Sequence, residues 1–269
     1  MNNNSPIGIF DSGIGGMTVA KMIQKRLPNE SMIYFGDTAH LPYGDKSPST
    51  IRHYAARISA WLIEHKVKAV VIACNTASSH AFETVRDICG PNVPVINVID
   101  PVVKHVAESF SLGKIGVIGT KGTIESKVYP RRLKKANSKL QVVSQSTPLL
   151  APMIEEGFFN NTISRSVINS YLSKKTFNEL QGLILGCTHY PLIQKEIREH
   201  YANDVRVIDS AKVVAEACAQ VLEEHNLLCS ENAKPEYKFY VSDYTESFKR
   251  STKIFFKKST DLVEARIWD

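Results

Sequence analysis

The chain has 269 residues, of which 43% are hydrophobic and 22% charged, so it can bury a large core as one large domain or two smaller ones. Its formal net charge is +6 at pH 7. Residues 1–5 show no basic segment followed by an apolar one, and the apolar runs are far shorter than the ~20 residues that cross a bilayer. The sequence therefore predicts a cytoplasmic globular protein and excludes a membrane protein.

The positive charge is spread along the chain, with its densest groups at 131–135 and 257–258. Both groups have amphipathic helical spacing and lack stacking aromatic residues, which favours solvent-exposed helix faces over a nucleic-acid surface. The five cysteines are irregularly spaced and include no Cys-x-x-Cys pair. This pattern indicates neither a disulfide framework nor a zinc site, and it predicts free thiols.

Short β-branched runs alternate with amphipathic helical stretches, which predicts parallel sheets covered by helices. Several runs are apolar at consecutive positions, as suits strands buried on both faces. Ligand sites in such folds lie beyond the carboxyl ends of the strands. Eight strands are expected, at 7–10, 32–35, 69–73, 93–98, 115–118, 140–144, 183–185 and 205–208.

Helix signals occur between these runs. Ser47-Pro48 and Thr123 are expected to open two helices. A third helix is expected over 212–225, with its apolar face formed by Val213, Val214, Ala217, Val221 and Leu222.

A weak internal repeat divides the chain. Residues 7–13 (IGIFDSG) resemble 115–121 (IGVIGTK), and 71–76 (VIACNT) resemble 184–189 (ILGCTH), in the same order and at similar spacing. We therefore expect an α/β fold of two pseudo-symmetric three-layer domains with mainly parallel sheets, and an active site in the cleft between them. The predicted first domain comprises 1–99 plus 211–269 and carries Cys74, and the second comprises 100–210 and carries Cys187.

The two cysteines of the repeat each follow a buried strand. Residues 75–79 are suited to begin a helix, whose N-terminus would stabilise a thiolate and lower the pKa of Cys74. After Cys187, Gly186 and Thr188 repeat the pattern, and Pro191 suits a first helical turn. One strand-end cysteine is more often a packing residue, but two in matching contexts favour a catalytic pair.

The other three cysteines lie within or beside helical stretches and have no polar constellation around them in the sequence. They are therefore expected to be structural: Cys89, Cys218 and Cys229.

The loop at 11–16 (DSGIGG) follows a strand and precedes a helix, and Asp37 ends the next strand, as in a dinucleotide-binding fold. However, Thr18 occupies the third glycine position, and the Asp11 carboxylate would repel a pyrophosphate. A carboxylate there better suits a ligand ammonium group. Because the loop N–H groups could still bind a phosphate, a nucleotide-binding regulator is the main non-enzymatic alternative.

Two further segments carry polar groups. Pro42-Tyr43-Gly44 follows the second strand as a turn that can present backbone donors and a ring to a pocket, although in isolation such a turn is more often an ordinary surface turn. Glu155 and Glu156 lie near a helix end, and only one of two adjacent carboxylates is expected to face inward.

Four of these strings, at 10–16 (FDSGIGG), 42–44 (PYG), 73–77 (ACNTA) and 185–191 (LGCTHYP), together resemble the bacterial glutamate racemases. The string at 188–191 resembles the glutamate branch of the aspartate/glutamate racemase superfamily rather than the Thr-Glu pattern of aspartate racemases. The resemblance implies an isomerase that supplies D-glutamate for bacterial peptidoglycan, hence for cell-wall biogenesis and cell shape. Aspartate racemase is the nearest enzymatic alternative, and a thiol hydrolase is a weaker one because no base is paired locally with a single cysteine.

The resemblance also assigns roles to residues. It makes Cys74 and Cys187 the catalytic thiols, supported by Asp11, Glu155 and His189 as acid, base and hydrogen-bonding groups. It implies substrate contacts at Asp11, Ser12, Pro42, Tyr43, Gly44, Asn75, Thr76, Thr120, Thr188 and His189. Members of the family often form homodimers, so a homodimer is the assembly it implies, although the sequence identifies no interface.

Two thiols suit racemisation, because a proton must leave one face of the α-carbon and another must arrive on the opposite face. One cysteine, as thiolate, abstracts the proton while the other, as thiol, delivers one. Charge that develops on the substrate carboxylate can be stabilised by backbone N–H groups and by hydroxyls. Cysteine and histidine are not clustered at metal-ligand spacing, and no strand-end lysine suggests a pyridoxal Schiff base, so neither metal nor cofactor is expected.

Overall fold

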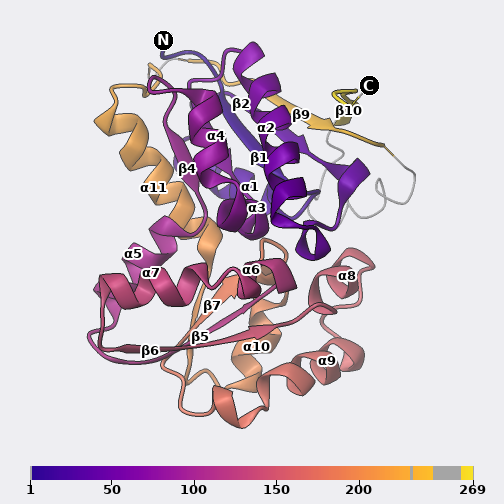
Figure 1. Ribbon diagram of the computed structural model, residues 1–269, viewed down its shortest axis with the longest axis vertical. Coiled ribbons are helices and arrows are strands. Elements are labelled where there is room, and N and C mark those ends of the chain that lie inside the picture. Colours follow the sequence, from indigo (N-terminus) through magenta and orange to yellow (C-terminus); the bar gives the residue numbers. More distant parts are fainter. Residues whose placement is uncertain (1, 231–232, 245–261, 269) are drawn as a thin grey trace.

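A computed structural model describes residues 2–230, 233–244 and 262–268 of the chain. The described strands form two parallel sheets, one above the other in Figure 1. Sheet A has the order β10-β9-β2-β1-β3-β4 and sheet B the order β6-β5-β7-β8. The strands of sheet A are β1 (Ile7–Asp11), β2 (Met32–Gly36), β3 (Ala69–Ile72), β4 (Val95–Asn97), β9 (Tyr237–Val241) and β10 (Leu262–Glu264), and those of sheet B are β5 (Gly113–Gly119), β6 (Leu140–Ser146), β7 (Gly182–Gly186) and β8 (Arg206–Ile208).

The two sheets share one winding order. The sequence β2-β1-β3-β4 in sheet A corresponds to β6-β5-β7-β8 in sheet B, and neighbouring strands are parallel throughout. This correspondence accounts for the internal repeat, since the matching strings fall on β1 and β5 and on the ends of β3 and β7. The α/β class and all eight predicted strands are confirmed.

Strands β9 and β10 were not predicted. They extend sheet A beyond β2, with β9 pairing with β2 and β10 with β9. Strand β9 has the sequence YKFYV and is only partly buried, so it lacks the fully buried run that marks strands such as β1 and β3. The described part of 211–269 therefore adds strands to the sheet that carries Cys74, while the predicted domain limits stay a prediction.

Helices cover both faces of each sheet, which makes each half three-layered. Sheet A packs against α1 (Met17–Arg26) and α11 (Ser210–Glu224) on one face, and against α2 (Pro48–Glu64) and α4 (Phe82–Cys89) on the other. Sheet B packs against α7 (Val128–Ala136), with α5 (Asp100–Ser109) beside it, on one face and against α8 (Leu150–Glu155), α9 (Thr162–Leu172) and α10 (Gln194–His200) on the other. Because helices bury both faces of each sheet, the strands can be apolar at consecutive positions.

Helix α11 runs alongside both halves (Figure 1) and packs against α1, α5, β4 and β7. One hydrophobic cluster consequently contains strand residues of both sheets, such as Ile9 and Ile184. The buried face of α11 is centred on Val214, Cys218 and Leu222, whereas Val213, Ala217 and Val221 are half-buried, so the expected apolar face was right only in part.

Two predicted helix starts can be compared with the structure. Ser47 caps α2 and Pro48 begins it, as predicted. The prediction that Thr123 opens a helix was wrong, because the helix begins earlier: the Thr120 hydroxyl accepts a hydrogen bond from the Thr123 N–H and caps it. The remaining described elements are short. They are η1 (Thr38–His40), η2 (Tyr43–Asp45), α3 (Asn75–His80), α6 (Lys121–Glu125), η3 (Lys175–Phe177) and η4 (Tyr190–Ile193).

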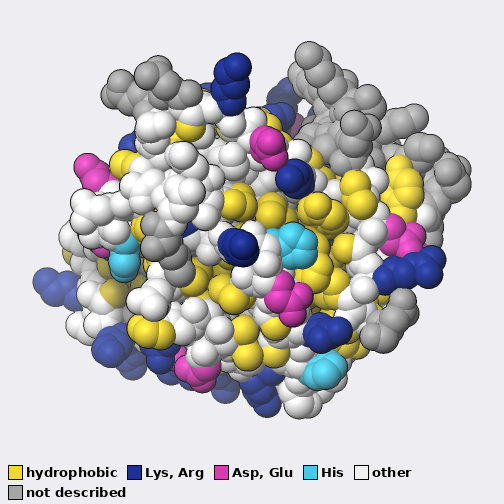
Figure 2. Space-filling model, turned by 90° about the horizontal axis from the view of Figure 1, so that it is seen from above, with side chains coloured by type: hydrophobic (Ala, Val, Ile, Leu, Met, Phe, Trp, Pro, Cys, Tyr) yellow, Lys and Arg dark blue, Asp and Glu magenta, His cyan; other side chains and the backbone are white. Residues whose placement is uncertain are grey.

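One of the two dense basic groups of the sequence lies on α7. In α7, Arg131, Lys134 and Lys135 are exposed while Leu133 is buried, which confirms an amphipathic helix; the pair at 257–258 lies outside the described residues. On the face shown in Figure 2, lysine and arginine side chains lie mostly toward the rim and hydrophobic ones toward the middle. Within 2–230, 233–244 and 262–268, no helix is long and apolar enough to cross a bilayer.

Candidate active site

The two thiols of the repeat meet at one cavity. Cys74 directly follows β3 and Cys187 directly follows β7, and both line a cavity of about 170 Å³ between the two halves. Because the carboxyl ends of β3 and β7 face this cavity, each half of the fold contributes one cysteine to it.

Nearly all residues predicted for the site lie in the wall of this cavity. They are Ser12, Pro42, Tyr43, Gly44, Cys74, Asn75, Thr76, Thr120, Glu155, Cys187, Thr188 and His189. Asp11 is the exception, since it lies behind the wall and contacts the loop that follows it. The wall also includes residues that the sequence did not assign to the site, namely Gly13, Leu41, Ala151, Pro152 and Gly186.

Cys74 is the N-cap of α3. Its Sγ accepts a hydrogen bond from the Ala77 N–H at 3.4 Å and lies 3.7 Å from the Ser12 hydroxyl. Burial raises the pKa of Cys74 to about 12, and the nearby Asp11 charge adds to the effect. The expectation of a lowered pKa was wrong, because loss of solvation outweighs the hydrogen bonds at this helix end. At neutral pH Cys74 is therefore a thiol, ready to donate a proton.

Cys187 lies at the end of a chain of polar contacts. Its Sγ is 3.6 Å from Nδ1 of His189, whose Nε2 lies 2.9 Å from a carboxylate oxygen of Glu155. Burial lowers the pKa of His189, but hydrogen bonds and negative charge from Cys187 and Glu155 outweigh burial and hold that pKa well above its usual range. A protonated imidazole here can stabilise a thiolate on Cys187. The two sides of the cavity are thus electrostatically unequal.

Asp11 is fully buried and organises the glycine loop. Its Oδ2 accepts hydrogen bonds from the Gly13 N–H at 3.1 Å and the Gly16 N–H at 2.9 Å. Burial raises its pKa, while the His189 charge and the backbone N–H groups oppose this shift without cancelling it. Two of the loop donors that a phosphate could use are therefore engaged by Asp11, which weakens the nucleotide-binding alternative.

Hydroxyl groups join the two halves beside the cavity. The Oγ1 atoms of Thr76 and Thr120 are 2.8 Å apart, and Thr120 donates to Thr123 at 3.0 Å. On the other side of the cavity, the Thr18 hydroxyl donates to the Thr188 carbonyl at 3.0 Å. These contacts hold residues from both repeats in a common wall.

The turn at Pro42-Tyr43-Gly44 follows a cis Leu41–Pro42 peptide bond. Tyr43 is buried, and its hydroxyl donates to Oδ2 of Asp37 at 2.6 Å; burial and the Asp37 charge raise the Tyr43 pKa well above its usual range. A Cβ on Gly44 would lie 2.8 Å from Cβ of Thr120, so the turn also packs closely against the opposite half. Asp37 thereby supports the site instead of binding a ribose.

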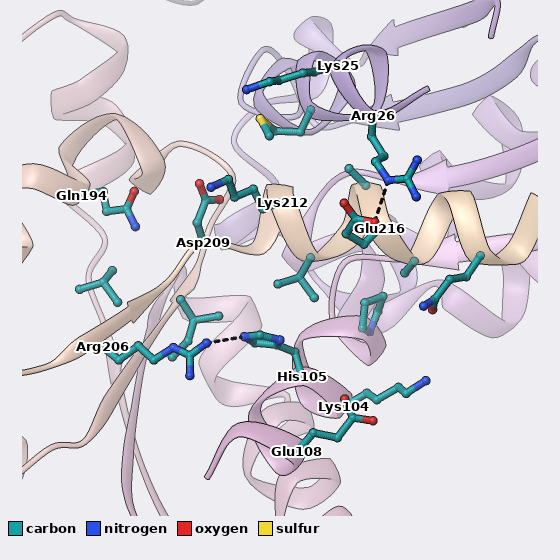
Figure 3. Close-up of a pocket in the computed structure, with 18 of the residues that line it drawn as sticks. Lys25, Arg26, Lys104, His105, Glu108, Gln194, Arg206, Asp209, Lys212 and Glu216 are labelled. Atoms are coloured by element: carbon teal, nitrogen blue, oxygen red, sulfur yellow. Dashed lines mark hydrogen bonds and ion pairs between the residues drawn. The ribbon is translucent and has the colours of Figure 1, made fainter. Parts of the chain in front are cut away.

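A larger pocket of about 700 Å³ lies elsewhere, among α1, α5, β8, α10 and α11 (Figure 3). Its wall is rich in basic side chains, including Lys25, Lys104 and Lys212. Arg26 pairs with Glu216 at 2.7 Å. No cysteine is among the described residues that line it, so the chemistry of paired thiols belongs to the smaller cavity. Across 2–230, 233–244 and 262–268, no group of three or more His, Cys, Asp or Glu side chains is placed to hold a metal ion.

Comparison with known proteins identifies the family of this chain. Residues 17–218 match the Asp/Glu/Hydantoin racemase family, and the chain belongs to that family. It is 40% identical to a glutamate racemase of Neisseria meningitidis over 96% of this chain and 95% of the relative, and 41% identical to one of Geobacter metallireducens over 91% and 90%.

The chain is also similar to solved structures of glutamate racemases. Glutamate racemase from Francisella tularensis in complex with D-glutamate matches with a TM-score of 0.92 and 40% identity over 99% of both chains. An aspartate racemase from Picrophilus torridus matches with a TM-score of 0.59 and 18% identity over 83% of this chain and 99% of its own, which indicates a shared fold alone.

Proposed function

We propose that this protein is a glutamate racemase, which interconverts L-glutamate and D-glutamate without a cofactor by using Cys74 and Cys187 on opposite faces of the α-carbon. The observation that carries the proposal is that both strand-end thiols line one cavity, each from a different half of the fold. At about 170 Å³ the cavity is smaller than the ~300–1,000 Å³ of pockets for drug-sized ligands, so it suits an amino acid.

In one direction, the Cys187 thiolate takes the α-proton, and the electron pair of the C–H bond moves onto the α-carboxylate. The Cys74 thiol then gives its proton to the opposite face, which leaves the other enantiomer, a Cys187 thiol and a Cys74 thiolate. The reverse direction uses the cysteines in exchanged roles. A thiolate whose conjugate acid has a raised pKa is a stronger base, which helps Cys74 to remove a weakly acidic proton.

Polar groups around the cavity suit the charges of glutamate. The hydroxyls of Ser12, Thr76 and Thr188 can donate to carboxylate oxygens and stabilise the charge that develops there. His189, between Cys187 and Glu155, can carry a proton to and from the thiol. Asp11 places negative charge behind the wall, where it can favour the substrate ammonium group.

Glutamate is favoured over aspartate because relatives named glutamate racemase share about 40% identity over nearly the whole chain. The string at 188–191 supports the same choice. In this role the enzyme provides D-glutamate for bacterial peptidoglycan. A cytoplasmic location and a homodimer stay predictions from the sequence and the family.

The test is a racemisation assay on purified protein freed of metal and cofactors, with both enantiomers of glutamate and of aspartate, analysed by chiral chromatography. In D₂O the α-position of the product should carry deuterium. Cys74→Ala and Cys187→Ala should each lose activity by about 10³-fold or more, because each variant lacks one of two required proton-transfer groups.

Cys218→Ala is the matched control, since Cys218 is a buried thiol of α11 that does not line the cavity, and it should keep full activity. Full activity in Cys74→Ala or Cys187→Ala would refute the two-thiol mechanism. Turnover of aspartate but not of glutamate would refute the choice of substrate.

A further inference from the structure

Asn75, the residue that follows Cys74, has an unequal set of partners. Its side chain is 3% exposed and lines the cavity. Its Oδ1 accepts a hydrogen bond from the Tyr129 hydroxyl at 2.7 Å. Its Nδ2 has no hydrogen-bond partner among the described residues.

A buried amide with an unused N–H₂ group is unfavourable, because lost hydration is not replaced by a protein acceptor. A ligand that brings an acceptor into the cavity removes this cost. A carboxylate suits the position best, since it only accepts hydrogen bonds, whereas an ammonium group only donates them. The free end of Asn75 is therefore complementary to an anionic group.

The Tyr129 hydroxyl decides which end of the amide is free. Burial raises the Tyr129 pKa well above its usual range, so the hydroxyl stays protonated and can donate. Because Oδ1 is bonded to Tyr129, Nδ2 is the end of the amide that is left without a partner among the described residues. In the opposite orientation Oδ1 would face the substrate carboxylate and repel it.

Tyr129 can do this because its ring is immobilised by packing. It lies on α7, is 1% exposed, and belongs with Val128 and Leu133 to the hydrophobic cluster that both sheets share. The bond to Asn75 thus crosses from the half that carries Cys187 to the half that carries Cys74. The amide is correctly oriented only when the two halves have this arrangement.

We propose that Tyr129 is a positioning residue, which fixes the Asn75 amide so that Nδ2 donates to a carboxylate of the amino-acid substrate. This inference rests on the proposed function for the identity of that substrate. Tyr129 itself does not line the cavity, so it acts through Asn75.

The test is a double-mutant cycle on glutamate racemisation. Tyr129→Phe keeps the ring and removes the hydroxyl, and kcat/KM should fall about 10-fold, as expected when the Asn75 amide is no longer fixed to donate to the charged substrate carboxylate. Asn75→Ala should lower kcat/KM at least as much. In the Asn75→Ala background, Tyr129→Phe should cause no further loss, because no amide remains to be oriented.

A purely structural role for Tyr129 predicts the same factor of loss in both backgrounds, and this outcome would overturn the proposal. If Tyr129→Phe does not fold, which circular dichroism would detect, Asn75→Ala alone decides: an unchanged kcat/KM would show that the amide does not bind substrate. Tyr237→Phe is the matched control, because its hydroxyl contacts the Pro28 carbonyl far from the cavity, and it should match the parent protein.

Failure of the proposed function would be seen separately. If the unmodified protein racemises glutamate but the cycle is additive, only the role of Tyr129 is refuted. If the unmodified protein racemises neither glutamate nor aspartate, the proposed function itself fails, whatever the variants do.

Discussion

A Cβ atom on Gly15 would lie 2.4 Å from Nδ1 of His189. The two residues belong to opposite halves of the fold, so this glycine sets how closely the first repeat approaches the polar chain behind Cys187. A side chain on Gly15 would also meet the Thr188 hydroxyl at 2.5 Å. Within the loop that resembles a dinucleotide loop in sequence, Gly15 is therefore required by contact between the halves, whereas Gly16 is required by close packing against Asp11 and Ala73 of its own half.

We predict that Gly15→Ala impairs catalysis more than stability. The added methyl group displaces His189 from Cys187, and a misplacement of about 1 Å in a catalytic arrangement can cost ~10²-fold in rate. The free energy of unfolding should fall by only about 1–3 kcal/mol, as for other overpacked sites. Steady-state kinetics and urea unfolding measure the two effects.

Gly8→Ala provides the comparison, because its added Cβ would lie 3.0 Å from a Val67 methyl group, away from the cavity. This variant should lose stability and keep its kcat. Equal kcat values for Gly8→Ala and Gly15→Ala would contradict the role given to Gly15.

We predict that Glu155→Gln lowers the pKa of His189 and slows turnover about 10-fold. The Glu155 carboxylate, 2.9 Å from Nε2, is one of the groups that keep the imidazole protonated. Without that charge the imidazole loses its proton at lower pH and supports a Cys187 thiolate less well. NMR titration of the histidine side chains and the pH dependence of kcat test this.

Glu156→Gln is the matched control, since Glu156 is the neighbouring carboxylate, is exposed and does not line the cavity. It should leave both the His189 pKa and kcat unchanged. If the His189 pKa is unchanged in Glu155→Gln, groups other than Glu155 stabilise the protonated imidazole.

The raised pKa of Cys74 predicts a specific loss of stability at alkaline pH. In the unfolded chain Cys74 has the ordinary thiol pKa of 9.0, whereas burial in the folded protein raises this pKa to about 12. Between these values the folded state binds more protons than the unfolded state, so stability falls as pH rises. Below pH 9 the contribution is constant.

At pH 10 this effect amounts to about 1 kcal/mol for one thiol. The free energy of unfolding of Cys74→Ser, which has no titrating group at this position, should therefore fall less between pH 8 and pH 10 than that of the parent protein. Parallel pH profiles for the two proteins would show that Cys74 titrates normally in the folded state.

The sequence predicted those features that depend on local pattern. Strands buried on both faces appear in the sequence as consecutive apolar residues. The internal repeat predicted that Cys74 and Cys187 lie at equivalent strand ends, and both line one cavity. Features that depend on distant neighbours could not be predicted. Tyr129 contacts Asn75 across 54 positions of sequence, and Cys74 has a raised pKa because of burial that only the packed structure reveals.

The environment of Asp37 could not be predicted either, because two of its partners, Ser242 and Trp268, are more than 200 positions away in the sequence. Its Oδ2 accepts from Tyr43 at 2.6 Å, and its Oδ1 accepts from Ser242 at 2.7 Å and from Trp268 at 3.1 Å. His40 Nδ1 also lies 3.0 Å from Oδ1. A single buried carboxylate thus links the C-terminal part of the described chain to the turn that lines the cavity.

We predict that Asp37→Asn destabilises the protein by about 2–4 kcal/mol and raises KM for glutamate, because an amide N–H₂ group must face donors that the carboxylate accepts from. Trp268→Phe removes one donor and leaves the carboxylate in place, so it should cost about 1 kcal/mol and keep KM. Urea unfolding and steady-state kinetics on both variants make the comparison. If Asp37→Asn is no less stable than Trp268→Phe and has the parent KM, the carboxylate does not organise the Tyr43 turn, and the packing around Tyr43 must hold it instead.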